Sequence, residues 1–252
     1  MNINKEEFRK YLLNVCEKQG YLWQAAIMED PHLVGMNIDP KENICDVSID
    51  VYAEMIERTG KQSVSLIELG GGLPREAFYL AEKGLVSRIV SIDKSVQESG
   101  QLETLADVVG LKGIVKSLKL DLETQKPETD PADIVVSRNF LYGAANSVVE
   151  YILGEMHYNV SNKKVLDNTL HLCNSIFGVI RIITDGSGKL NRRKVKREMK
   201  DRGFEIVSDG SNKLKLFISS PVTQISYQGI QMAQPMHLHE ESAADYVIAK
   251  KQ

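Results

Sequence analysis

One short segment constrains the fold of this chain more than any other. A β-type run, Val64-Ser-Leu-Ile, ends at Glu68 and enters the glycines Gly70-Gly71-Gly72. A helical pattern follows over 74–83, and a second strand-like run ends at Asp93. Glycines let the backbone turn sharply and approach a ligand closely, where a Cβ atom would collide. The order strand, glycine turn, helix, strand predicts the nucleotide-binding half of an α/β domain.

The alternation of strands and helices continues through most of the chain. We expect further helices at 96–109, 147–157, 164–174 and 191–202, and further strands at 114–120, 133–137 and 178–184. Such alternation predicts a parallel sheet with helices on both faces. The chain ends differently, with strand-like runs at 204–207, 214–219 and 246–249 and no helix between them. This ending indicates an antiparallel pair that closes the sheet.

The first 60 residues have a different, helical pattern, with amphipathic helices expected at 5–19 and 47–58. We therefore predict an N-terminal helical cap over 1–60 and an α/β domain over 61–252, with insertions near 144–161 and 220–245. At 252 residues and 42% hydrophobic, the chain is long enough for one such domain with an appendage. The fold class is α/β: a doubly wound, mostly parallel sheet with an antiparallel C-terminal strand.

Charge and cysteine content exclude several classes of protein. The net charge of −3 argues against a protein built mainly to bind nucleic acid, but it does not exclude a local basic patch. The segment 189–202 holds eight lysines and arginines, which either contact RNA or an acidic substrate or form a solvated outer face. The overall acidity favours the solvated face. Three cysteines far apart favour a reduced, cytoplasmic protein without a disulfide framework or zinc site. No apolar run is long enough to span a bilayer.

The acid at the end of the second strand points to an adenosine cofactor. Asp93 lies 25 positions after Glu68, which is about one βαβ half-unit. A carboxylate at this place accepts hydrogen bonds from both ribose hydroxyls of an adenosine group. That much fits NAD as well as S-adenosylmethionine.

Three details favour S-adenosylmethionine. The third glycine of a dinucleotide-binding turn is replaced by Arg75, although close helix packing under a diphosphate needs a glycine there. Glu68 would repel a diphosphate but attract a cationic sulfonium ligand with an α-amino group. Arg75 can form a two-pronged pair with the carboxylate of such a ligand.

The runs Leu66-Ile-Glu-Leu-Gly-Gly-Gly, Ile92-Asp93, Leu120-Asp121-Leu122 and Asp133-Ile-Val-Val together resemble the Rossmann-like, class I S-adenosylmethionine-dependent methyltransferases. The resemblance spans about 63–251. It implies that Gly70 and Gly72 line the methionine part of the cofactor and that Asp93 holds the ribose. It further implies that Lys94 flanks the adenine, and that Asp121 and Leu122 contact the adenine amine and ring.

The resemblance also assigns the residues that follow the fourth strand. Ser137 and Asn139 would face the methionine moiety and the substrate. The continuation Gly72-Leu-Pro-Arg75 is similar to the branch related to leucine carboxyl methyltransferases, in which an arginine at this place binds the cofactor carboxylate. That branch usually carries a small polar or acidic residue where Pro74 stands here.

Fewer sequence features indicate the identity of the methyl acceptor. Methyltransferases that act on nucleobase amines carry Asp/Asn-Pro-Pro-Tyr/Phe after the fourth strand, whereas Ser137-Arg-Asn-Phe140 stands here, so that chemistry is disfavoured. Candidate catalytic groups are His32, His237, His239 and Tyr142. His237 and His239 could also grip a metal, but no further ligand pattern completes a site, and we expect none.

The leading hypothesis is a methyltransferase that acts on a small molecule, with O- or carboxyl-methylation favoured. The alternatives are an aminocarboxypropyl transferase of the nicotianamine-synthase type that uses the same cofactor, an NAD-dependent oxidoreductase, and a non-catalytic pseudo-methyltransferase. The sequence leaves the oligomeric state open.

Overall fold

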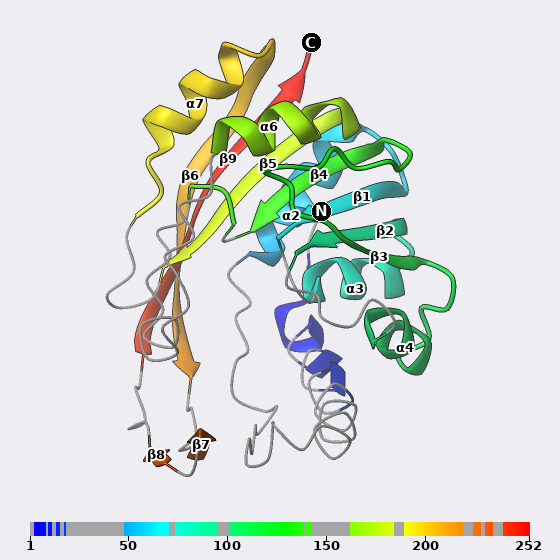
Figure 1. The fold of residues 1–252 in the computed structure, drawn as a ribbon, viewed down its shortest axis with the longest axis vertical. Coiled ribbons are helices and arrows are strands. Elements are labelled where there is room, and N and C mark those ends of the chain that lie inside the picture. The colour runs from blue at the N-terminus through cyan, green and yellow to red at the C-terminus, as the bar shows by residue number, and fades with distance from the viewer. Residues whose placement is uncertain are drawn as a thin grey trace.

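The computed structural model describes residues 3–8, 10–11, 14–15, 18, 48–70, 74–94, 101–138, 140–142, 162–183, 189–218, 224–227, 230–233 and 239–252. Their centre is a seven-stranded sheet in the order β3-β2-β1-β4-β5-β9-β6 (Figure 1). Its strands are β1 (Val64–Leu69), β2 (Val86–Asp93), β3 (Val115–Lys119), β4 (Ala132–Arg138), β5 (Cys173–Ile183), β6 (Phe204–Ile218) and β9 (His239–Lys251). β1 to β5 run parallel, and β9 is antiparallel to both β5 and β6. The predicted fold class, including the antiparallel ending, is confirmed.

Helices cover both faces of this sheet, as the alternating pattern predicts. α2 (Ile49–Thr59), α3 (Arg75–Glu82) and α4 (Gln101–Val108) pack on one face, and α6 (Asn162–Thr169) and α7 (Arg192–Lys200) on the other. Successive strand residues point to opposite faces, so Leu66 belongs to the first core and Ile67 to the second. α2 ends where Gly60 adopts a left-handed conformation with φ 72°.

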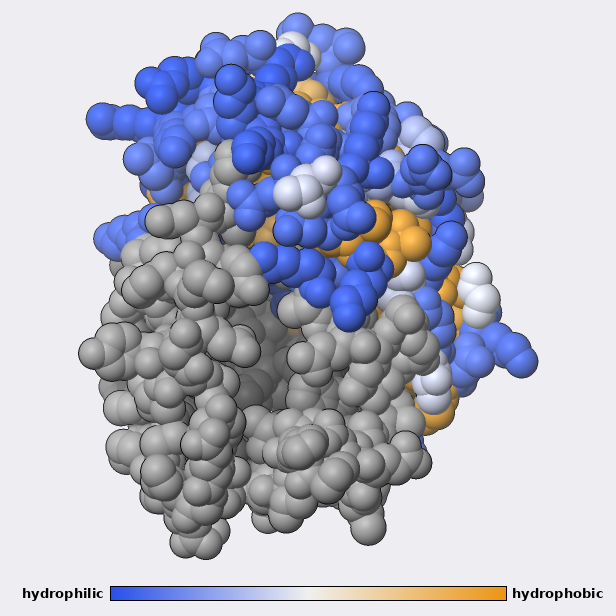
Figure 2. Space-filling view, viewed as in Figure 1, coloured by the Kyte–Doolittle hydropathy of each residue, from blue (hydrophilic) through white to orange (hydrophobic). Residues whose placement is uncertain are grey.

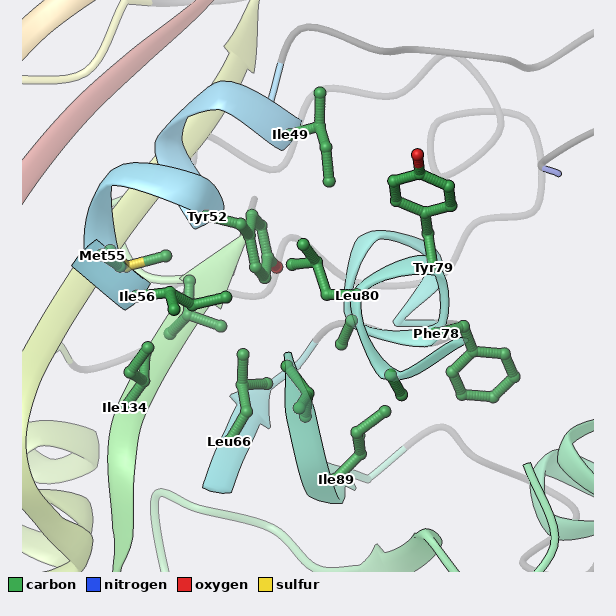
Figure 3. Close-up of a cluster of buried hydrophobic side chains, with 14 of the residues drawn as sticks. Ile49, Tyr52, Met55, Ile56, Leu66, Phe78, Tyr79, Leu80, Ile89 and Ile134 are labelled. Carbon is green, nitrogen blue, oxygen red and sulfur yellow. The ribbon is translucent and has the colours of Figure 1, made fainter. Parts of the chain in front are cut away.

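The N-terminal helical residues share the first of these cores. Tyr52 and Met55 of α2 belong to the same buried cluster as Leu66 of β1 (Figure 3). A Cβ atom at Gly178 of β5 would lie 2.3 Å from the Met55 sulfur, so the glycine permits the close approach of α2 to the sheet. Phe8 is fully buried, and its ring centroid lies 5.0 Å from that of Tyr79 in α3.

The structure corrects several predicted boundaries. The two strands expected at 204–207 and 214–219 are one strand, β6, because its pairing with β9 continues through the turn-like Ser208-Asp-Gly-Ser-Asn. A β-bulge between Ile206 and Ser208 absorbs the irregularity. β9 likewise begins at His239, seven residues before the predicted strand. The helix expected at 164–174 ends at Thr169, and β5 begins at Cys173, where it pairs with β4.

The predicted insertion at 220–245 holds a separate two-stranded hairpin, β7 (Gln224–Tyr227) with β8 (Ile230–Ala233). The helix predicted at 147–157 and the whole of the insertion at 144–161 lie outside the described residues.

Candidate functional site

A pocket opens at the carboxyl edge of the sheet, beside the point where the strand order reverses between β1 and β4. It has about 260 Å³ of empty space that includes its open side. Gly70 after β1, Asp93 at the end of β2, Leu122 after β3 and Phe140 after β4 all line it. Because these strands are parallel, four segments that are distant in the sequence meet at one edge. This switch point is where open α/β sheets bind their ligands.

Gly70 forms the floor of the turn that closes this pocket. Its φ of +62° lies in the left-handed region, and its N–H donates a 2.7 Å hydrogen bond to the Ile92 carbonyl. A Cβ atom here would lie 2.2 Å from Cγ of Phe140. Both the backbone conformation and the close aromatic ring therefore require glycine at this position.

The pocket combines an apolar wall with an acidic one. Ile92 and Leu122 are buried, and Leu120 and Phe140 complete the apolar surface. The residues that line the pocket also include Asp93, Asp121, Glu123 and Lys94, which together carry a formal charge of −2. The Glu123 N–H donates a 2.9 Å hydrogen bond to the Asp121 carboxylate, which fixes the turn after β3. The surplus of negative charge favours a cationic ligand with a flat apolar part.

Glu68 does not line this pocket but lies in a buried polar cluster under the sheet edge, with Ser48, Tyr52, Glu76 and Arg138. Glu68 is 0% exposed, and Nε of Arg138 lies 3.3 Å from its Oε1. Nη1 of Arg138 lies 3.0 Å from both oxygens of Glu76 and donates a hydrogen bond to Oε1. The Ser48 hydroxyl donates to the same Glu76 oxygen. One guanidinium therefore joins two buried carboxyl groups.

The charges in this cluster do not balance when both carboxyl groups are ionised. Burial raises the pKa of Glu68 to about 7, against the lowering effect of Arg138 and with a further rise from Glu76. The same burial, together with Glu68 and Glu76, raises the pKa of the Tyr52 hydroxyl. Hydrogen bonds from the Tyr52 hydroxyl and from Arg138 lower the pKa of Glu68 and so offset part of its rise. The cluster is thus ready to accept a proton or a cationic donor.

The turn after β4 is fixed by two of the predicted site residues. The Ser137 hydroxyl is buried and accepts a 2.9 Å hydrogen bond from the Leu141 N–H. Tyr142 has an unusual φ of 57°, its N–H donates to Asn162 of α6, and its hydroxyl donates to Glu198 of α7. Burial and the Glu198 carboxylate raise the pKa of this hydroxyl. The contacts suit Tyr142 to anchor the turn rather than to accept a proton near neutral pH.

The structure brings part of the predicted cofactor site together. Five predicted residues line the pocket: Gly70, Asp93, Lys94, Asp121 and Leu122. Glu68 and Ser137 lie beside it in the sheet, with the hydrogen bonds described above. Gly71, Gly72, Asn139, His32 and His237 lie outside the described residues, as do the side chains of Arg75 and His239.

Phe140, Glu123 and Arg138 are among the residues of the site that were not predicted. Phe140 occupies the place of the aromatic residue in the nucleobase methyltransferase pattern, which was the signal available for it. Glu123 follows the predicted Asp121 by two positions and reaches the pocket through the turn. Arg138 gave no local signal, because its partners Glu68 and Glu76 lie 70 and 62 positions away.

Comparison with known structures places the fold. No protein-family model and no curated protein sequence matches the chain. Among solved structures, the cyclase SpnF matches with a TM-score of 0.54 at 13% identity over 93% of each chain. Magnesium protoporphyrin IX methyltransferase from Synechocystis PCC 6803 with bound SAH matches with a TM-score of 0.51 at 12% identity, over 99% of this chain and 100% of that one. A putative RNA methyltransferase from Pyrococcus horikoshii matches with a TM-score of 0.52 at 13% identity, over 100% of this chain and 99% of that one.

The chain therefore has the Rossmann-like fold of the class I S-adenosylmethionine-dependent methyltransferases. None of the described helices is long and apolar enough to cross a membrane. The described residues also contain no group of three or more histidine, cysteine or acidic side chains placed to hold a metal ion.

Proposed function

We propose that this chain is an S-adenosylmethionine-dependent methyltransferase that acts on an oxygen or carboxylate of a small molecule. The pocket at the β1/β4 switch point carries this proposal, because Asp93, Asp121 and Glu123 outnumber Lys94 among its charged lining residues and the rest of the lining is mainly apolar. The diphosphate of a dinucleotide would be repelled there. S-adenosylmethionine carries a sulfonium and an ammonium group against one carboxylate, so the same lining attracts it.

In this proposal each pocket residue contacts a different part of the cofactor. Asp93 accepts hydrogen bonds from the ribose hydroxyls, and Asp121 accepts one from the adenine amine. The adenine ring lies between Leu122 and Phe140, and the methionine part passes over Gly70. Lys94 borders the adenine. We extend the proposal to the other predicted residues: Gly71, Gly72, Arg75, Ser137 and Asn139 along the methionine part, and Glu68 toward its ammonium group.

Two observations support a small-molecule acceptor. The turn after β4 lacks the Asp/Asn-Pro-Pro sequence of nucleobase amine methyltransferases. One structural neighbour is by name a methyltransferase for magnesium protoporphyrin IX, and its structure holds SAH. Another neighbour is by name a cyclase, so the fold alone does not fix the reaction. The candidate bases His32, His237 and His239 remain proposals for the acceptor side of the site.

Isothermal titration calorimetry tests the cofactor directly. We expect S-adenosylhomocysteine to bind with a dissociation constant in the micromolar range and NADH not to bind. Binding of NADH in place of S-adenosylhomocysteine would overturn the proposal in favour of an oxidoreductase.

Asp93→Asn tests the ribose contact within the same assay. Because the variant loses charged hydrogen bonds to two hydroxyls, its affinity for S-adenosylhomocysteine should fall about 10- to 100-fold. Asp130→Asn is the matched control, because Asp130 is 96% exposed at the opposite end of the strands and should leave the affinity unchanged. An unchanged affinity for the Asp93 variant would remove this residue from the site.

The product of the cofactor separates methyl transfer from its closest alternative. Mass spectrometry after incubation with S-adenosylmethionine and a cell extract should detect S-adenosylhomocysteine. Methylthioadenosine in its place would show transfer of the aminocarboxypropyl group.

A further inference from the structure

The outer face of α7 is made entirely of cationic side chains. Val195 and Met199 are fully buried against the sheet, and the residues that point the other way at helical spacing are Arg193, Lys194, Lys196, Arg197 and Lys200. Glu198, which is half-buried, is the one acidic residue of α7 and borders this face beside Lys194. We call this outer face the basic face of α7.

Some of these cations have carboxylate partners in the structure. Lys196 lies 3.1 Å from Asp209, and Lys194 lies 4.0 Å from Glu198. Arg193, Arg197 and Lys200 are exposed, and the described part of the chain places no carboxylate within ion-pair distance of them. Their i, i+4, i+7 spacing aligns them in one row of about 10 Å along the helix. An exposed row of this kind is available to an external anion.

Helix stability explains only part of this charge. The first turn of α7 holds Arg192, Arg193 and Lys194 and no acid, although the helix dipole favours acids there. Arg197 and Lys200 lie in the last turn, where the dipole favours cations. Arg193 and Arg197 are like charges at i, i+4, which repel each other. The cations of the first turn therefore do not serve the stability of the helix.

The positive charge extends beyond α7 to its neighbour. Arg202 joins α7 to Asp167 of α6 at 3.2 Å, and α6 adds the exposed Lys163 and Lys164. Residues 162–169 and 189–202 with Asp209 contain ten lysines and arginines against four acids, a net charge of +6. The whole chain carries −3, so the rest of it carries −9. The surface over α7 is accordingly hydrophilic in the upper left of the molecule (Figure 2).

The composition of this surface selects among anionic partners. A helix that inserts into a membrane interface exposes an apolar face, whereas the apolar face of α7 is buried in the core. Proteins that bind single-stranded nucleic acid stack bases on aromatic side chains, and neither α6 nor α7 contains an aromatic residue. A nucleic-acid duplex needs neither feature, because it presents rows of phosphates with its bases paired inside.

We propose that the basic face of α7 is a docking surface for the phosphate backbone of a nucleic-acid duplex, which it binds without reading sequence. Arg193, Arg197 and Lys200 form its centre, with Lys189 and the two lysines of α6 at its margins. This surface is separate from the cofactor pocket. With three or four phosphate contacts, binding is weak and depends steeply on salt.

Fluorescence anisotropy with a labelled 20-base-pair RNA duplex, and with a DNA duplex of the same sequence, tests the surface. For four contacts we expect the affinity to fall about 100-fold between 50 and 200 mM salt. The triple variant Arg193→Glu, Arg197→Glu, Lys200→Glu should bind the duplex at least 20-fold more weakly than the unmodified protein at 50 mM salt. The control variant Lys112→Glu, Lys116→Glu, Lys126→Glu makes the same charge change at exposed sites elsewhere, and its affinity for the duplex should fall less than threefold.

Each outcome decides for or against the surface. Binding of either duplex that the α7 variant loses and the control keeps supports it. No duplex binding at 50 mM salt, equal losses in both variants, or stronger binding to vesicles with 30% phosphatidylserine would overturn it. Thermal unfolding and S-adenosylhomocysteine binding of the α7 variant should match those of the unmodified protein. Failure of the unmodified protein to bind S-adenosylhomocysteine would refute the proposed function and leave the duplex result standing.

Discussion

Replacement of Glu68 by glutamine should stabilise the protein at alkaline pH. Glu68 is fully buried beside one guanidinium and a second carboxyl group, and its pKa is raised to about 7 from 4.5. Glutamine has nearly the same shape and can still accept a hydrogen bond from Arg138. It cannot ionise, so it never places a charge in this cluster.

The sign and size of the effect follow from proton linkage. Between pH 4.5 and about 7 the folded protein holds a proton on Glu68 that the unfolded chain has lost. The folded state is therefore favoured below pH 4.5, and this advantage is lost as the pH rises through about 7. The difference between the two pKa values corresponds to about 3 kcal/mol. At pH 8 Glu68→Gln should be more stable than the unmodified protein by about 2–3 kcal/mol, and near pH 4.5 the two should be nearly equal.

Urea unfolding at pH 4.5 and pH 8, followed by circular dichroism, measures both values. The exposed Glu128→Gln is the matched control and should change stability by less than about 0.5 kcal/mol at either pH. A Glu68 variant that is less stable than the unmodified protein at pH 8 would show that Glu68 is ionised and paired with Arg138. The reasoning about the charge balance would then be refuted.

Two further substitutions test the pocket and the turn after β4. Gly70→Ala should lower the affinity for S-adenosylhomocysteine, measured by calorimetry, at least 10-fold. The added Cβ atom would collide with Phe140, and alanine is strained at the φ of this position. An unchanged affinity would show that the ligand does not bind against Gly70. Tyr142→Phe should lower the free energy of unfolding by about 2 kcal/mol, through loss of the bond to Glu198, while cofactor affinity changes less than twofold. Unchanged stability in urea unfolding would contradict the anchoring role.

The sheet was predictable from sequence because its signals are local. β1 and β2, for example, are runs rich in apolar residues, the first followed directly by Gly70 and the second ending at Asp93. β6 was not predictable as one strand, because Ser208-Asp-Gly-Ser-Asn has the composition of a turn. Only pairing with β9, which lies about 40 residues away, keeps this segment extended.

The residues of the site likewise fall into those that were predictable from local sequence and those that were not. Gly70, Asp93 and Asp121 follow directly from strand ends, since parallel strands present their carboxyl ends at one edge. The partnership of Glu68 with Arg138 and Glu76 depends on tertiary packing and left no pattern in the sequence. The basic face of α7 was visible as a charge run, but the net charge of the chain concealed how unevenly the charge is distributed.

A crystal structure of the complex with S-adenosylhomocysteine would show directly whether the pocket at the β1/β4 switch point binds the cofactor. We expect the ribose hydroxyls to lie within hydrogen-bond distance of Asp93 and the adenine ring to lie between Leu122 and Phe140. A ligand bound elsewhere, or an empty pocket at saturating ligand, would contradict this expectation.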